Sequence, residues 1–248
     1  MTSFSGYNIN TAPCCGVTYS TRRYASINYS SAEYWTDGYR EKSLMPNDRG
    51  LRRCRCGNFF LQRQLIVVGQ VATTDVPSAP MVDPEELPKA IAEVRNSSIE
   101  LVARLDYWQH LNHPYRECYR AHREAEEAVT RAAWEASNPD LRSSIHKALR
   151  PGRIPKYAPP ADRPVTFPPF QPSAEQRENM MAALDLISAA ADAERYALER
   201  VELHRELGQF GEARQALQAV DGQTYATLHR LTTRFIEMQV AAVVRYRI

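Results

Sequence analysis

The sequence lacks long hydrophobic runs and a secretory signal. Its best apolar runs, residues 65–68 and 240–244, are far shorter than the ~20 residues that a membrane helix needs, so no membrane association is expected. Met1 is not followed by a basic stretch and then an apolar one, so a Sec-type signal is not expected either. These absences predict a cytoplasmic protein.

The motifs of common enzyme classes are also missing. There is no glycine-rich phosphate loop, no Gly-x-Ser-x-Gly nucleophile turn and no His-Glu-x-x-His metal motif. Many acidic residues alternate with arginine at helical spacing, which is typical of a solvated helix face. The sequence therefore indicates no catalytic residue and no small-molecule substrate, and we expect a non-enzymatic protein.

Cysteine is scarce, but four of the five cysteines lie in two short cysteine-glycine motifs. The first knuckle is Cys-Cys-Gly at residues 14–16, and the second knuckle is Cys-Arg-Cys-Gly at residues 54–57. An odd number of cysteines in a reducing compartment favours metal binding over disulfides. Two knuckles at hairpin tips are how a zinc ribbon gathers four thiolates around one structural ion. The predicted zinc ligands are Cys14, Cys15, Cys54 and Cys56.

The net charge of +2 is unevenly distributed along the chain. Nine basic and four acidic residues give +5 up to residue 71, and the remainder of the chain carries −3. A basic zinc module can contact nucleic-acid phosphates, or its cations can simply offset the thiolate charge. The candidate contacts for a nucleic acid or another partner are Arg22, Arg23, Arg52, Arg53, Arg55, Tyr34 and Trp35. Tyrosines that could stack on bases are Tyr19, Tyr24, Tyr29, Tyr34 and Tyr39.

Composition divides the chain into four regions. Residues 1–75 are rich in Tyr, Thr, Ser and Asn, which favours strands, and Asp37-Gly38 predicts a hairpin turn. Residues 76–150 have helical spacing, with Leu101, Leu105 and Trp108 on one face and a break at Pro114. Residues 151–172 hold eight of the sixteen prolines and form a linker. Its aromatic residues predict a segment that packs against the protein: Tyr157, Phe167 and Phe170.

The last region, residues 173–248, is predicted to be helical. Ser173 and Gln176 form a capping box that starts a helix. Apolar residues on both sides of Gly208 predict a helical hairpin. Its local sequence, residues 207–213, is similar to part of a tetratricopeptide repeat, although an ordinary hairpin explains it equally well. An apolar stripe that ends the chain makes self-association an option: Ile236, Val240, Val243 and Val244.

The order of these motifs resembles a group of functionally uncharacterised bacterial proteins. The likeness lies in the first knuckle, Trp-Thr-Asp-Gly at 35–38, Leu-Met-Pro at 44–46, the second knuckle with Asn-Phe-Phe at 58–60, and the hairpin at 206–213. Those proteins carry an N-terminal zinc ribbon and a C-terminal tetratricopeptide-like helical region. The resemblance implies fold and metal, and it implies no activity.

The chain departs from that pattern at the ligands. The usual knuckle is Cys-Pro-x-Cys-Gly, whereas here both knuckles lack the first cysteine and gain one closer to the glycine. Four thiolates remain, and they can bind one tetrahedral ion only if the loops are altered. The alternatives are therefore a zinc site and a degenerate ribbon that binds no metal or is partly ligated.

A second group of metal-ligand residue types, His110, His113, Cys118 and His122, lies in the helical region. We interpret the histidines as packing residues and Cys118 as a buried thiol, because arginine and aromatic residues crowd this segment.

The sequence as a whole predicts an α+β protein that is mainly α. A small zinc-ribbon-like β module precedes helical hairpins. The leading functional hypothesis is a non-enzymatic adaptor or regulatory protein whose helices bind a protein partner. The alternative is a nucleic-acid-binding protein that uses the basic, tyrosine-rich ribbon.

Overall fold

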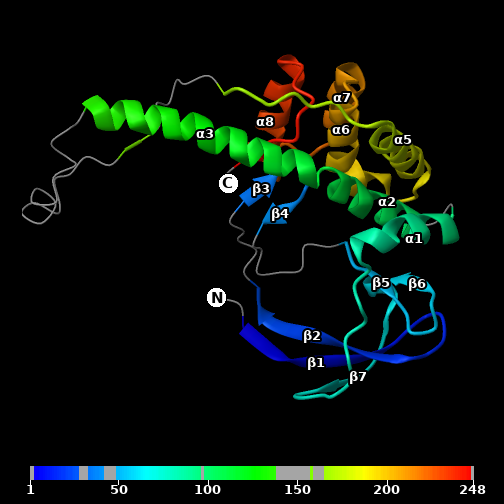
Figure 1. The fold of residues 1–248 in the computed structure, drawn as a ribbon. Coiled ribbons are helices and arrows are strands. Elements are labelled where there is room, and N and C mark those ends of the chain that lie inside the picture. Colours follow the sequence, from blue (N-terminus) through cyan, green and yellow to red (C-terminus); the bar gives the residue numbers. More distant parts are fainter. Residues whose placement is uncertain are drawn as a thin grey trace, which may run out of the picture. The chain divides into compact units, whose positions relative to one another are not determined.

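The computed structural model of the chain describes residues 3–27, 33–41, 49–95, 98–137, 157–158 and 165–246. The fold is α+β and mainly α, as the sequence predicts (Figure 1). The chain divides into two compact units, one of Met1–Asn112 with Gln171–Ile248 and the other of His113–Phe170. The strands are β1 (Ser3–Thr11), β2 (Thr18–Ser26), β3 (Glu33–Trp35), β4 (Arg40–Glu41), β5 (Leu51–Arg53), β6 (Phe59–Leu61), β7 (Ile66–Val71) and β8 (Arg245–Tyr246). The helices are α1 (Leu87–Glu93), α2 (Ser98–Leu111), α3 (His113–Ser137), α5 (Ala174–Ala189), α6 (Ala197–Glu206), α7 (Phe210–Leu217) and α8 (Ala226–Glu237).

The described strands of the first unit form three small sheets. Their orders are β2-β1-β7, β4-β3-β8 and β5-β6, and every strand pair is antiparallel. The β1–β2 hairpin is long, with Thr11 paired to Thr18 next to the turn. The β5–β6 hairpin is short, with Arg53 paired to Phe59 next to its turn. Each of these two hairpins carries one knuckle at its tip.

The turn predicted at Asp37-Gly38 is confirmed. It joins β3 to β4, with Gly38 N–H donating to the Trp35 carbonyl at 2.9 Å and Trp35 N–H donating to the Tyr39 carbonyl at 3.0 Å. The other edge of β3 pairs with β8, near the end of the described chain. This sheet therefore joins the N-terminal and C-terminal regions of the chain.

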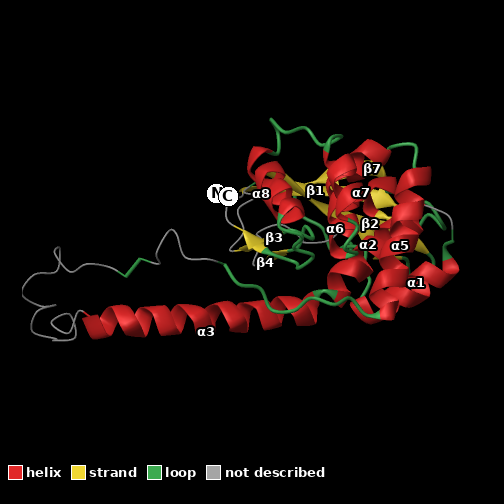
Figure 2. Cartoon of the chain, turned by 90° about the horizontal axis from the view of Figure 1, so that it is seen from above, coloured by secondary structure: helices red, strands yellow, loops and turns green. Residues whose placement is uncertain are grey.

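Helices α1 and α5 of the first unit pack against α2. Leu101, Leu105 and Trp108 are buried against Met180 and Ile187 of α5, which confirms the predicted face. Figure 2 shows α5, α6 and α7 grouped near α2. The capping box that starts α5 is confirmed too, because Gln176 N–H donates to the Ser173 hydroxyl at 3.1 Å. None of the described helices has the long apolar stretch that crossing a bilayer requires.

A helical hairpin is present where the sequence predicts one. Helices α6 and α7 lie on either side of residues 207–209, and Val201 of α6 is buried with Ala213 and Leu217 of α7. Ile236 of α8 joins the same cluster. The C-terminal apolar stripe is therefore largely buried inside the chain, since Val243 and Val244 are buried as well.

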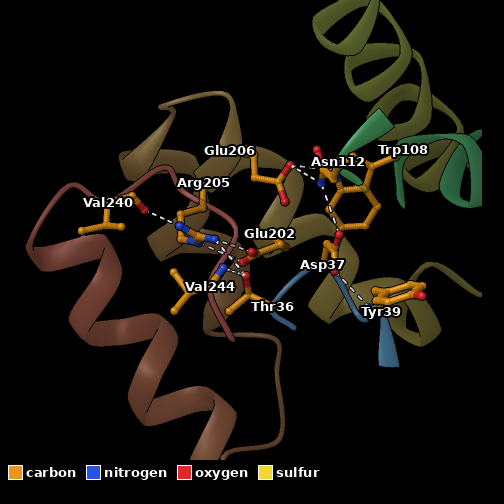
Figure 3. A network of polar contacts seen from close by, with 10 residues as sticks. All are labelled: Thr36, Asp37, Tyr39, Trp108, Asn112, Glu202, Arg205, Glu206, Val240 and Val244. Carbon is orange, nitrogen blue, oxygen red and sulfur yellow. Dashed lines mark hydrogen bonds and ion pairs between the residues drawn. The ribbon is translucent and has the colours of Figure 1, made fainter. Parts of the chain in front are cut away.

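A polar network lies in the interior of this unit (Figure 3). The polar network consists of the turn residues Thr36 and Asp37, Trp108 of α2, Asn112 directly after α2, and Glu202, Arg205 and Glu206 of α6. Trp108 Nε1–H and Asn112 Nδ2–H both donate to Glu206 Oε2, at 2.7 and 3.0 Å. Arg205 donates to the Thr36 hydroxyl at 3.2 Å, and that hydroxyl accepts the Val244 N–H at 3.0 Å. Buried polar groups thus fix the position of the 36–38 turn.

The second unit consists of α3 and the described part of the proline-rich segment. The Tyr115 hydroxyl donates to the Pro168 carbonyl at 2.9 Å, and the Tyr115 ring lies 4.7 Å from the ring of Phe170. Phe167 lies 6.4 Å from Tyr119, and Tyr157 lies 5.9 Å from Trp134, in each case between ring centroids. The predicted packing of the three aromatic residues is confirmed. Most of the linker prolines, in residues 151–156 and 159–164, lie outside the described residues.

Candidate metal centre

The first knuckle is the turn between β1 and β2. Ala12 N–H donates to the Val17 carbonyl at 2.9 Å, and Gly16 N–H donates back to the Ala12 carbonyl at 3.0 Å. Gly16 has a φ of +74°, a conformation that L side chains rarely adopt. This tight turn exposes Cys14 and Cys15 at the hairpin tip.

The second knuckle is built in the same way between β5 and β6. Cys54 N–H donates to the Asn58 carbonyl at 2.8 Å, and Gly57 N–H donates to the Cys54 carbonyl at 2.9 Å. Gly57 has a φ of +93°. Cys54 is buried and Cys56 is exposed, so the second knuckle supplies one buried thiol and one solvent-exposed thiol.

The segment at residues 76–81 links the two hairpins. Ser20 of β2 donates its N–H to the Pro77 carbonyl at 2.9 Å and its hydroxyl to the Val76 carbonyl at 2.7 Å. Arg53 N–H of β5 donates to the Pro80 carbonyl at 3.1 Å. The sequence assigns these residues to the helical region, whereas in the structure they precede the first helix and their backbone bonds hold both hairpins.

The thiols of the four knuckle cysteines lie close together. We call these four residues the cysteine cluster. The Sγ–Sγ distances are 3.4 Å for Cys15–Cys54, 3.5 Å for Cys14–Cys56 and 3.8 Å for Cys14–Cys15. All four sulfurs lie within 4.8 Å of one another. A tetrahedral ion with ~2.3 Å metal–sulfur bonds requires sulfur separations of ~3.8 Å. The four sulfurs are therefore close enough to bind one metal ion.

The buried side chain of Tyr19 contacts the cysteine cluster. Its side chain is fully buried, and its ring stacks on Phe60 with centroids 6.1 Å apart. The Tyr19 hydroxyl donates to Cys54 Sγ at 3.5 Å and accepts the Arg55 N–H at 2.8 Å. Such an outer contact orients a ligand sulfur and spreads its negative charge.

The thiols of Cys14 and Cys54 differ in pKa. Cys14 is exposed as a residue, but partial desolvation of its thiol raises its pKa, and hydrogen bonds to Cys54 and Cys56 raise it further. Burial acts in the same direction on Cys54, but hydrogen bonds from the Cys56 amide, the Tyr19 hydroxyl and Cys15 outweigh it and lower the Cys54 pKa to about 6. Burial and the bond to Cys54 raise the pKa of Tyr19, which keeps its hydroxyl a donor. One thiolate forms readily, and further thiolates need a cation to offset their mutual repulsion.

The residues predicted to contact a nucleic acid or another partner differ in exposure and in the contacts they make within the protein. Arg22 and Arg55 are exposed and Arg23 is partly buried. Arg53 forms an ion pair with Glu86, and buried Arg52 donates to the Leu51 carbonyl at 2.8 Å and to Gln62. Two expectations need correction, because the side chains of Arg52 and Trp35 are buried in the protein and are not available to a partner.

The five tyrosines proposed for base stacking do not form one surface either. Tyr19 is fully buried beneath the cysteine cluster, and Tyr29 lies outside the described residues. Tyr34 belongs to β3 and contacts Tyr246 of β8, with ring centroids 5.9 Å apart. Tyr34 is thus placed beside a C-terminal strand rather than beside the knuckles.

The histidine group of the helical region does not form a metal site in the part of the chain that the structure describes. His113 lies 3.9 Å from a Glu117 oxygen, and His122 Nε2 lies 3.0 Å from the Thr166 hydroxyl. Cys118 is exposed, which corrects the expectation of a buried thiol, because it lies on a solvated face of α3. Within the described residues, the metal-binding distances are met by the cysteine cluster.

Comparison of the chain with protein-family models, curated proteins and solved structures gave no match.

Proposed function

We propose that the cysteine cluster binds one zinc ion as a structural centre, and that the protein is a non-enzymatic interaction protein. The observation that carries the zinc proposal is the convergence of four sulfurs from two hairpin tips within 4.8 Å. Tetrahedral all-sulfur sites favour zinc or iron among biological metals, and a single ion without sulfide bridges favours zinc. A four-thiolate shell leaves no open position for water, so the ion stabilises the fold and performs no chemistry.

The zinc would act as a crosslink. The β5–β6 hairpin has only three residues in each strand, which is too little for stability by itself. A metal bond from its tip to the β1–β2 tip would fix the two hairpins, together with the 76–81 segment. Zinc in this role contributes directly to folding free energy. Thiolate ligands also need a reducing compartment, which supports a cytoplasmic location.

The partner surface is proposed on the helices. The α6–α7 hairpin contains the local sequence that is similar to part of a tetratricopeptide repeat, and repeats of that kind bind extended peptides or other subunits. A protein partner is favoured over nucleic acid because two of the five candidate arginines, Arg52 and Arg53, already have partners within the protein.

Elemental analysis of the purified full-length protein tests the metal. We expect one zinc per chain in the wild type and in Cys118→Ser, a matched variant of an exposed cysteine outside the cluster. The Cys54→Ser/Cys56→Ser variant should contain none and should lose amide protection in β1, β2, β5 and β6. Absence of zinc from the wild type, or its retention in the double variant, would refute the proposal.

A salt series tests the partner class. Binding of a protein that persists at high salt would support the interaction role. Binding of DNA or RNA that weakens steeply with salt would support the nucleic-acid alternative instead, because phosphate contacts release counterions.

A further inference from the structure

A cavity of about 640 Å³ is lined by the β4-β3-β8 sheet and by residues of the helices α2, α6 and α8. Small-molecule sites have volumes of ~300–1,000 Å³, so the size fits a metabolite-sized ligand. The cavity contains none of the four cysteines, and its residues come from both ends of the chain. We call it the tyrosine–arginine cavity after its main side chains: Tyr34, Tyr225, Tyr246, Arg40, Arg49 and Arg195.

One wall is a row of side chains across the sheet. Tyr34 of β3 is paired with Arg40 of β4 on one side and with Tyr246 of β8 on the other. Directly paired residues on neighbouring strands place their side chains on the same face. The Tyr34 and Tyr246 rings lie 5.9 Å apart at 36° to each other, so two aromatic rings and a guanidinium line this wall.

The chemistry of this wall suits a planar ring. Aromatic side chains offer flat apolar faces at little entropic cost, and arginine stacks on planar groups as well. Burial raises the pKa of Tyr246 to about 12, so its hydroxyl remains a neutral hydrogen-bond donor at physiological pH. The wall can therefore hold a ring by stacking and also by hydrogen bonding.

The second wall, formed by helical segments, offers positive charge. It includes Arg195 before α6, Glu199 on α6, and Tyr225 to Leu228 at the start of α8. The first turn of α8 contains no acidic residue, and no side chain caps it, so its backbone N–H groups add to the positive potential. Arg195 is exposed at this wall.

The charge balance of the cavity is positive. Three arginines line it, against two acids, Asp37 and Glu199. Glu199 lies 3.7 Å from Arg49, whose guanidinium also bonds Asp106 at 3.3 Å. Asp37 is buried and accepts the Tyr39 N–H at 3.0 Å. Both acids thus have partners within the protein. Among the described residues, no acidic side chain forms an ion pair with Arg195.

We propose that the tyrosine–arginine cavity binds a small molecule that joins a planar aromatic ring to a phosphate, as a nucleoside monophosphate does. The ring would stack on the Tyr34 and Tyr246 wall. The phosphate would lie between Arg195 and the first turn of α8, because charged oxygens gain most from a guanidinium and free backbone amides.

Calorimetric titration of the full-length protein with AMP, adenosine and inorganic phosphate tests this site. We expect AMP to bind at least about tenfold more tightly than either adenosine or phosphate, because only AMP engages both walls. No binding of AMP at about 5 mM, or phosphate binding as tightly as AMP, would overturn the proposal.

Variants locate the binding. Arg195→Gln should weaken AMP about tenfold, and Tyr34→Leu should do the same for AMP and also for adenosine. Arg230→Gln, an exposed arginine on α8 outside the cavity, is the matched control and should leave the AMP affinity unchanged. Because Arg195 is exposed, its replacement does not threaten folding. Equal AMP affinity in Arg195→Gln and the wild type would overturn the proposal, whatever the zinc analysis shows.

Discussion

Arg205 and Glu202, three residues apart on α6, form an ion pair whose side chains are 0% and 4% exposed. The Arg205 Nε–H donates to Glu202 Oε2 at 2.9 Å. The same guanidinium donates to the Val240 carbonyl and lies 5.6 Å above the ring of Phe235. One side chain thus joins α6, α8, the C-terminal segment and the 36–38 turn.

Loss of Arg205 alone should be severe. Arg205→Met leaves the buried Glu202 carboxylate without its cation, and we expect a loss of about 3–5 kcal/mol in the free energy of unfolding. Urea denaturation measures it. The double variant Arg205→Met/Glu202→Leu removes both charges and should recover a large part of the loss. A double variant no more stable than the single one would contradict a dominant role for this pair.

Glu206 should make stability depend on pH. Complete burial, and then the charges of Glu202 and Asp37, raise its pKa well above the ordinary value of 4.5. Above pH 4.5 the unfolded chain releases this proton while the folded protein keeps it, so wild-type stability falls as pH rises toward the folded pKa.

Glu206→Gln should remove this dependence. Near pH 4 the free energy of unfolding of the variant should be about that of the wild type, because the Glu206 carboxyl is then largely protonated in both the folded and the unfolded state. It should gain about 1.4 kcal/mol relative to the wild type for each pH unit between the two pKa values. Urea denaturation from pH 4 to pH 8 measures the difference. Parallel curves for the two proteins would show that the carboxyl is ionised in the folded state.

Tyr19→Phe should weaken metal binding without removing a ligand. It deletes the hydroxyl that lies 3.5 Å from Cys54 Sγ and leaves the Arg55 N–H without its acceptor. Outer contacts of this kind are worth about 10–100-fold in metal affinity. Competition with a chromogenic chelator measures the change. Tyr24→Phe, on the same strand, is the control, and equal losses in both variants would rule out a specific contact.

Gly57→Ala should destabilise the second knuckle through its backbone alone. A Cβ at Gly57 meets no atom within 4 Å, yet the residue has a φ of +93°. The left-handed conformation costs a non-glycine residue about 1–2 kcal/mol. Gly69→Ala is a matched control, because its Cβ would also meet no atom within 4 Å and its φ is not positive. Thermal unfolding that is equally affected by both changes would refute this explanation.

Local features of this fold follow from local sequence. The 37–38 turn, the start of α5 at Ser173 and the buried face of α2 depend on residues a few positions apart, and each was predicted correctly. The same holds for the four thiols at two hairpin tips, because a cysteine-glycine motif itself specifies the turn. The proximity of the two tips, in contrast, depends on the 76–81 segment, whose backbone bonds carry no sequence signal.

Other features depend on residues far apart in the chain. Nothing in the tripeptide Glu33–Trp35 specifies pairing with Arg245–Tyr246, and this pairing places Tyr34 and Trp35 away from the knuckles. The exposure expected for Trp35 was wrong for this reason. The sequence likewise gave no indication of the tyrosine–arginine cavity, because its walls come from strands, loops and three helices that only tertiary packing brings together.

The sequence by itself therefore determined the turns, the helix starts, the apolar faces and the chemical type of the metal ligands, since each follows from short-range geometry. Tertiary structure decided which strands pair, which arginines are buried and where charge accumulates. Those outcomes depend on burial and on hydrogen bonds between distant residues, such as the bond from Arg205 to Thr36.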